Sequence, residues 1–142
     1  MTEAAPAWAV ALLRDGRVGR LATADAAGRP LAVPVCYAFD GERVYSAVDA
    51  KPKRTRALRR LRNIAENPRA SLVVDEYDEE WTRLRYVIVE GPADVLTGGP
   101  EFARAVDLLV AKYDQYRTLG LSRESGALIR LTPDRILHWR WT

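Results

Sequence analysis

The sequence predicts a mainly β fold of the α+β class: a small six-stranded antiparallel barrel with helices packed against its outside. Segments with strand character follow one another through tight turns, which pairs neighbouring strands antiparallel. Helical periodicity interrupts the strands only at 53–65 and 101–113, giving the order β-β-β-α-β-β-α-β. The glycine-rich phosphate loops and the Gly-x-Ser-x-Gly turn of doubly wound parallel folds are absent.

The first half of the chain predicts one short helix and three strands. Apolar residues recur at helical spacing over 7–14, and strands are expected at 18–23, 30–39 and 43–48. Asp40-Gly41 joins the last two strands as a hairpin, because glycine accepts the positive φ of a tight turn. These strands therefore form a consecutive antiparallel run.

The second half alternates helices and strands. The helix at 53–65 ends before Pro68, and the next strand, 70–75, is almost wholly apolar and is expected to be buried on both faces. A strand at 85–96 contains Gly91-Pro92, which predicts a bulge or a bend at a barrel corner.

A second helix and a final strand complete the chain. The helix over 101–113 follows Pro100, a residue that suits a first helical turn. The strand over 127–139 is interrupted near Thr132-Pro133-Asp134.

Length and composition predict a single domain covering residues 1–142. The chain is 48% hydrophobic and 29% charged, as expected for a folded globular protein with a real core. Its apolar runs fall far short of the ~20 residues that span a bilayer, and the first residues lack the charge of a signal peptide, so a cytoplasmic protein without a membrane partner is expected. One cysteine and one histidine exclude a disulfide framework and a Cys- or His-rich metal centre, so no metal is predicted.

Charge is segregated along the chain although the net charge is only +3. Seven basic residues lie between positions 51 and 62 with no acid among them, and five acidic residues lie between 75 and 80 with no base. Such segregation predicts one local site that attracts anions and another that repels them.

The basic segment predicts a phosphate or anion site. A strand ends near Val48, a proline-containing loop follows, and a helix begins with Lys53 and Arg54. Free backbone N–H groups at a helix N-terminus favour an anion, whereas cations there oppose the helix dipole unless an anion lies among them. Ser46 on the preceding strand offers a hydroxyl donor, and Lys51 a further charge.

Two alternatives compete for this segment. The arginines deeper in the helix, namely Arg59, Arg60 and Arg62, fit a solvated helix face. Binding to a nucleic-acid backbone is disfavoured because no aromatic residue interleaves with the charges, so no nucleic-acid partner is predicted.

Single aromatic and polar residues allow structural and functional interpretations. Residues 75–80 are expected in an exposed loop, with Tyr77 or Trp81 as a cover for a planar ligand. Trp139 and Trp141 alternate on a strand and therefore share a face, which is expected to pack in the core or at a subunit interface. Alternatively, Trp81, Trp139 and Trp141 line the substrate side. His138 is expected to be packed beside these tryptophans.

Cys36 and Tyr37 lie in an apolar stretch of the second strand. Cys36 is expected to be an inert buried thiol. Tyr37, or Tyr77, is a candidate proton donor.

Several motifs occur in an order that resembles one known family. They are Arg17-Val-Gly-Arg-Leu-Ala-Thr23, Gly28-Arg-Pro-Leu-Ala-Val-Pro34, the basic run Lys51-Pro-Lys-Arg54, Asn67-Pro-Arg-Ala-Ser-Leu72, Val89-Glu-Gly-Pro-Ala93 and the ending Leu131 to Arg140. Together they are similar to the pyridoxamine-phosphate-oxidase-like split β-barrel superfamily. The Arg- and Ala-rich composition most resembles the branch that uses the deazaflavin coenzyme F420.

The resemblance implies a split β-barrel homodimer with a cofactor in a groove at the subunit interface. It implies hydride transfer between F420 and a small organic substrate, in which the cofactor supplies the difficult chemistry. The cofactor-binding residues that it implies are Ser46, Lys51, Lys53 and Arg54 around the phosphate, and Val33, Pro34, Val35 and Cys36 along the ring.

Two other functions remain open on the same fold. One is an FMN-dependent oxidoreductase, because FMN shares a phosphate and a tricyclic ring with F420. The other is a non-catalytic carrier of F420, a flavin or haem, for which His138 is the one histidine available as an axial ligand.

Overall fold

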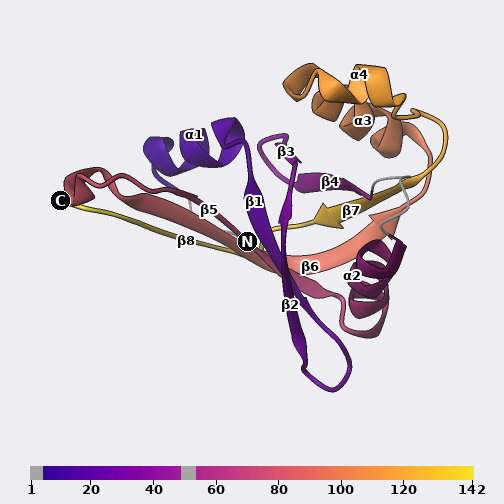
Figure 1. Ribbon diagram of the computed structural model, residues 1–142, viewed down its shortest axis with the longest axis horizontal. Coiled ribbons are helices and arrows are strands. Elements are labelled where there is room, and N and C mark those ends of the chain that lie inside the picture. Colours follow the sequence, from indigo (N-terminus) through magenta and orange to yellow (C-terminus); the bar gives the residue numbers. More distant parts are fainter. Residues whose placement is uncertain (1–4, 49–53) are drawn as a thin grey trace.

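The computed structural model describes residues 5–48 and 54–142 and has the predicted α+β architecture (Figure 1). All paired strands are antiparallel, in the order β2-β1-β5-β6-β7-β4-β3, and β8 pairs with β6 off this path. The strands are β1 (Gly19–Ala24), β2 (Pro30–Val35), β3 (Ala38–Phe39), β4 (Val44–Val48), β5 (Arg69–Glu76), β6 (Arg85–Leu96), β7 (Ala127–Leu131) and β8 (Arg135–Arg140).

Two predicted strands are each divided, which turns the six expected strands into eight. The division of the last strand falls at the predicted interruption, between Leu131 and Arg135. The division between Val35 and Ala38 was not predicted. There the chain leaves its partner β1 and begins to pair with β4, so β2 and β3 lie at opposite ends of the strand order.

Helices cover the sheet on separate sides of the molecule (Figure 1). They are α1 (Ala7–Asp15), α2 (Arg54–Glu66), α3 (Pro100–Lys112) and α4 (Gln115–Leu119), with a short 3₁₀ turn, η1 (Trp81–Arg83), between β5 and β6. The larger core lies beneath α1 and α2 and is centred on Leu13, Leu72 and Val89. A second core lies beneath α3, around Phe102 and Leu109.

β6 is the strand that joins the two halves of the sheet. It pairs with β8 along Arg85–Glu90, and from Ala93 onward it pairs on that side with β7. At the change, the Thr132 amide donates to the Pro92 carbonyl at 2.9 Å and the Asp134 amide donates to the Glu90 carbonyl at 2.9 Å. The predicted Gly91-Pro92 bend is therefore the point where β6 exchanges one partner for another.

The expectation that residues 70–75 are buried on both faces is wrong. Ala70, Leu72 and Val74 are buried, whereas Ser71 and Val73 are only half-buried. Successive side chains of β5 point to opposite faces of the sheet. The larger core lies on one of these faces only.

No helix within the described ranges is long and apolar enough to cross a bilayer.

We predict that Gly91→Ala strongly destabilises the fold. A Cβ atom at position 91 would lie 1.9 Å from the Thr132 carbonyl oxygen, and backbone cannot move away as a flexible side chain would. A loss of ~3 kcal/mol in the free energy of unfolding is expected, measured by urea titration. Gly98→Ala is the matched control, because its Cβ atom meets only an ordinary contact at 3.6 Å. Equal stability of the two variants would contradict the account of the bend.

Candidate functional site

The residues predicted to hold a phosphate are only partly described. Lys51 and Lys53 lie outside the described residues, and Arg54 is the first residue of α2, where the backbone alone is described. Ser46 lies on β4 and is buried, and its hydroxyl donates to the Cys36 carbonyl at 2.9 Å. The Ser46 hydroxyl, which was predicted to donate to a phosphate, thus donates instead to the connection between β2 and β3 and links it to β4.

The four residues predicted to lie along a planar ring are divided between two faces. Val35 is buried and Val33 packs against the larger core, whereas Pro34 and Cys36 are exposed. Only Pro34 and Cys36 are therefore presented to a ligand outside the barrel. The expectation of a buried Cys36 is wrong, because Val35 and Tyr37 on either side take the inward positions.

α2 carries a candidate residue that the sequence analysis assigned to a solvated face. Arg60 is half-buried, and its Nε–H lies away from solvent without a hydrogen-bond partner among the described residues. Burial lowers the pKa of the guanidinium, and the neighbouring Tyr116 of α4 opposes that shift. None of the ion pairs among the described residues involves Arg60.

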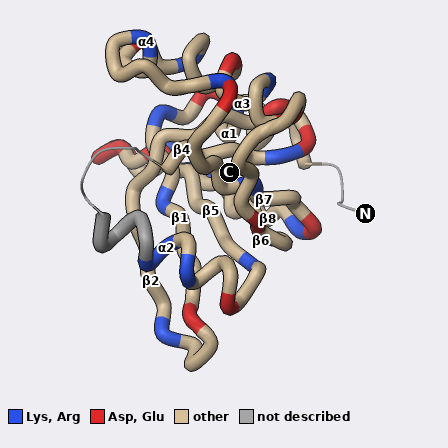
Figure 2. The backbone as a smooth tube through the Cα atoms, turned by 90° about the vertical axis from the view of Figure 1, so that its right-hand side faces the viewer, with Lys and Arg blue, Asp and Glu red and all other residues tan. Residues whose placement is uncertain are grey.

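The position of Arg60 follows from the way α2 docks. The helix packs against β1 and β6, and Figure 2 shows it alongside β1 and β2. Asn63 and Ile64 are buried, and Asn63 Nδ2 donates to Thr23 Oγ1 at 3.1 Å. Residues three and four positions apart share a helix face, so Arg60 lies one turn along from this anchored pair. The spacing of three and four residues between Arg60 and the pair Asn63 and Ile64 is the feature of the sequence that could have indicated the partial burial of Arg60.

A half-buried guanidinium with an unused N–H fits an anionic oxygen. Leaving a buried donor unsatisfied costs ~1–3 kcal/mol, and a charge-assisted hydrogen bond removes that cost. In the sequence, Arg60 lies six residues after Arg54, within the basic segment of residues 51 to 62. The arrangement suits a phosphate or a carboxylate bound beside α2.

The connection that carries Cys36 is held from the opposite side by the end of α3. Lys112 Nζ donates to the Tyr37 carbonyl at 3.0 Å and lies 3.9 Å from the centre of the Tyr37 ring. The Tyr113 hydroxyl donates to the Arg17 carbonyl at 2.9 Å and accepts a hydrogen bond from the Tyr37 amide at 3.3 Å. Burial, and next the charge of Arg17, lower the pKa of Lys112 to about 8.

Of the two candidate proton donors, Tyr37 does not face the exposed residues of β2. Tyr37 is fully buried and donates its hydroxyl hydrogen to the Leu13 carbonyl, and burial raises its pKa far above the ordinary value. Tyr77 lies beyond the end of β5 and is 65% exposed. The expectation that Tyr37 donates a proton is not compatible with its place in the core.

The acidic segment and the tryptophans are distributed along one end of the sheet. Trp81 is exposed in η1, as the sequence analysis allowed. Trp139 and Trp141 are also exposed, so of the two expected locations the core is wrong for both, and the subunit interface stays a prediction. Trp139 stacks on Tyr86 with ring centres 5.9 Å apart, and His138 meets Trp8 edge-on at 5.7 Å.

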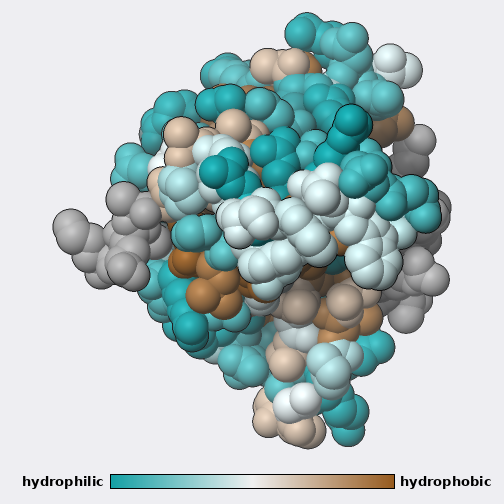
Figure 3. Space-filling model, turned by 90° about the vertical axis from the view of Figure 1, so that its left-hand side faces the viewer, coloured by the Kyte–Doolittle hydropathy of each residue, from teal (hydrophilic) through white to brown (hydrophobic). Residues whose placement is uncertain are grey.

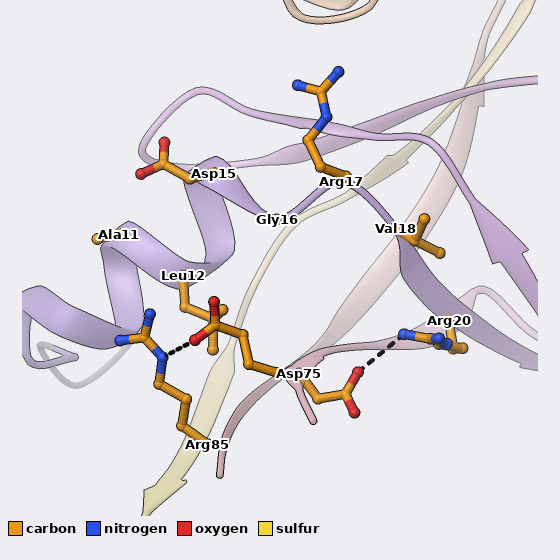
Figure 4. Close-up of a pocket in the computed structure, with 10 residues that line it drawn as sticks. Ala11, Leu12, Asp15, Gly16, Arg17, Val18, Arg20, Asp75 and Arg85 are labelled. Carbon is orange, nitrogen blue, oxygen red and sulfur yellow. Dashed lines mark hydrogen bonds and ion pairs between the residues drawn. The ribbon is translucent and has the colours of Figure 1, made fainter. Parts of the chain in front are cut away.

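A cavity of about 370 Å³ lies between the end of α1 and strands β1, β5 and β6 (Figure 4). Four of its six charged side chains form two ion pairs: Arg20 with Asp75 at 2.9 Å, and Arg85 with Glu76. The predicted acidic loop is thus partly a strand end, where Asp75 and Glu76 are neutralised by arginines. Within the described residues, no group of three His, Cys, Asp or Glu side chains is arranged to hold a metal.

Comparisons with known proteins place these features in context. The family model described as Pyridoxamine 5'-phosphate oxidase matches residues 6–140. A 5a,11a-dehydrotetracycline/5a,11a-dehydrooxytetracycline reductase of Streptomyces rimosus is 36% identical over 94 residues, an alignment that covers 65% of this chain and 65% of the relative.

Solved structures share the fold over nearly the whole chain. An F420 reductase is 26% identical with a TM-score of 0.62, covering 94% of this chain and 98% of its own. A haem storage protein from Vibrio cholerae is 18% identical with a TM-score of 0.68, covering 89% of this chain and 87% of its own. At that identity the second likeness concerns the fold alone.

We predict that the stability contributed at Lys112 rises with pH. The pKa of Lys112 is about 8 in the folded protein, and the ordinary value, which applies to the unfolded chain, is 10.5. Between these pH values the unfolded chain therefore binds more protons at this residue than the folded protein does. The free energy of unfolding of the wild type, relative to Lys112→Met, should therefore increase from pH 8 to pH 10.5. Parallel urea titrations of the two proteins measure this difference, and a difference that stays constant with pH would contradict the burial of the ammonium.

Proposed function

We propose, because this chain belongs to the pyridoxamine 5'-phosphate oxidase family, that it is an oxidoreductase that transfers a hydride between coenzyme F420 and a small organic substrate. The observation that carries the proposal is the half-buried guanidinium of Arg60, whose Nε–H has no hydrogen-bond partner in the part of the chain that the structure describes. An anionic group is what that guanidinium lacks, and the cofactor phosphate supplies one.

The comparisons support a redox reaction rather than a hydrolytic one. The relative at 36% identity is named as a reductase, and the solved structure at 26% identity is named as an F420 reductase. The family model extends over nearly all of the described residues, which favours a complete cofactor-binding barrel.

In this proposal the bound cofactor supplies the hydride chemistry, and the chain binds and orients it. Arg60, with Lys51, Lys53 and Arg54, would hold the phosphate. Pro34 and Cys36 are the exposed residues beside which a ring would lie, while Val33 and Val35 fix the strand from within the core. Lys112 and Tyr113 keep the connection at Cys36 in place through the Tyr37 backbone.

FMN is the second candidate cofactor, because it offers the same phosphate to Arg60. A carrier of haem is the third, and it would use the carboxylates of haem as anions. His138, the one histidine, belongs to β8 and lies edge-on to Trp8 of α1. It is therefore not on α2, which carries Arg60. The choice among the three is a matter of relative affinity.

We predict that Arg60→Gln weakens F420 binding ten- to a hundredfold. A hydrogen bond to a charged group contributes ~1.5–3 kcal/mol, which corresponds to that range. Arg62→Gln is the matched control, because Arg62 is an exposed arginine on the same helix. Fluorescence titration with F420, FMN and haemin gives the affinities, and the paired variant Lys51→Ala with Lys53→Ala tests the basic loop.

Each result of that titration has a definite meaning. Tighter binding of F420 than of FMN, lost in Arg60→Gln but not in Arg62→Gln, supports the proposal. Preference for FMN transfers the protein to the flavin branch, and binding of haemin alone makes it a carrier. Equal affinities of the Arg60 and Arg62 variants would remove Arg60 from the site.

We also propose that two copies of the chain pair through the outer face of the sheet. The registers align Val73, Ile88 and Leu137 on β5, β6 and β8 as a half-buried apolar stripe. Glu90 and Arg135 face each other across β6 and β8 in the adjacent row. An apolar stripe flanked by both charges is self-complementary under a two-fold rotation, which is the commonest symmetry of homodimers.

We predict that Ile88→Glu converts a dimer into a monomer. The introduced carboxylate would be desolvated against the second copy, at a cost that a half-buried isoleucine does not have. Leu108→Glu is the control, because Leu108 is a 38% exposed leucine on α3. Sedimentation equilibrium measures the mass, and a wild-type monomer, or an Ile88→Glu dimer, would exclude this face.

A further inference from the structure

We propose that the cavity at the ends of β6 and β8 is a second binding site, for a flat aromatic molecule that carries a carboxylate. The site is independent of the proposed cofactor site. In Figure 1 the C-terminal end of the chain and α2 lie at opposite sides of the molecule.

The cavity has a volume of about 510 Å³ and opens beside η1. Its apolar lining comes from Leu84 and Trp141. Thr82 also lines it, but the Thr82 hydroxyl donates to the Glu80 carboxylate at 2.9 Å. The Trp141 amide donates to the Leu84 carbonyl at 3.2 Å, which attaches the chain after β8 to the start of β6. The indole of Trp141 is 47% exposed and therefore has a free surface on which a second ring can stack.

The cationic lining exceeds the anionic lining. Among the side chains that line the cavity, three are guanidiniums, those of Arg83, Arg85 and Arg140, and one is a carboxylate, that of Glu76; Thr142 also lies on the wall. Glu76 is engaged by Arg85, with which it forms an ion pair across β5 and β6. Arg83 reaches only Asp78, at 3.8 Å.

Arg140 is the least compensated of the three. It lies directly opposite Arg85 in the pairing of β6 with β8, where like charges are destabilising. No ion pair among the described residues involves Arg140, whose guanidinium lies 5.1 Å from the centre of the Trp8 ring. An anion beside Arg140 would relieve its repulsion with Arg85, and Arg83 on the same cavity wall could bind that anion too.

The surface around this end is suited to a planar ligand. Figure 3 looks onto this end and shows residues of near-neutral hydropathy gathered at its centre, with hydrophilic residues above them and hydrophobic residues below and to the left. Arginine forms paired hydrogen bonds to carboxylates, and indole offers a flat apolar face, so a single molecule with a ring and a carboxylate matches both.

The test is the equilibrium binding of 2-naphthoate to the full-length protein, measured by isothermal titration calorimetry. 2-Naphthamide has the same rings without the charge, and cyclohexanecarboxylate has the charge without the aromatic face. Arg140→Gln, Arg83→Gln and Trp141→Leu alter the cavity. Arg104→Gln on α3 and Trp81→Leu in η1 are matched controls, because both residues are exposed and neither lines the cavity.

We expect saturable binding of 2-naphthoate that weakens at least tenfold in Trp141→Leu and in Arg140→Gln and keeps its affinity in both controls. Because the Arg83 side chain is 74% exposed, we expect Arg83→Gln to fold normally. This variant should also bind 2-naphthoate more weakly than the wild type. The proposal is overturned if 2-naphthoate does not saturate, if 2-naphthamide binds equally well, or if the cavity variants and the controls behave alike. Cofactor titrations of the same variants separate this result from the fate of the proposed function.

Discussion

The close approach of Gly91 to the Thr132 carbonyl is the constraint on which the rest of the structure depends. It allows the turn between β7 and β8 to press against β6, so that one strand serves β8 before the bend and β7 after it. Both cores are built on this arrangement, since Val89 before the bend belongs to one and Leu128 on β7 to the other. A side chain at position 91 would separate the two halves of the sheet.

The same division explains how the candidate site is assembled. β4 belongs to one half of the sheet and β1 to the other, and α2 follows β4 in the chain but docks on β1 through Asn63 and Thr23. α2 therefore lies in the part of the chain that leads from one half of the sheet to the other. Arg60 on this helix is half-buried, and this burial accounts for its lowered pKa.

Much of the fold was predictable because its signals are local. β6 has the predicted bounds, since alternation over 85–96 and the Gly91-Pro92 pair both lie within the strand. The division between β2 and β3 was not predictable, because no turn residue marks it. The Tyr37 amide leaves the ladder there and finds the hydroxyl of Tyr113, 76 residues away in the sequence. The exposure of Cys36 depends on the same long-range contact.

The candidate site was predictable only in its chemistry. The basic segment indicated an anion, but a run of arginines conceals which of them is buried, and that depends on how α2 and α4 pack. Trp139 and Trp141 were expected in the core or at a subunit interface, and the sequence could not decide between these because both bury apolar side chains; in the single chain both are exposed.

The position of β2 has a consequence for the behaviour of the protein at high concentration. β2 and β3 end the strand order, and an outermost strand presents unpaired peptide groups to which another chain can add by β-augmentation. β2 contains Pro30 and Pro34, neither of which has an amide hydrogen to offer, and β3 is only two residues long. Both ends of the strand order thus resist the growth of intermolecular β-structure, which keeps the exposed face of β2 available to a ligand rather than to an aggregate.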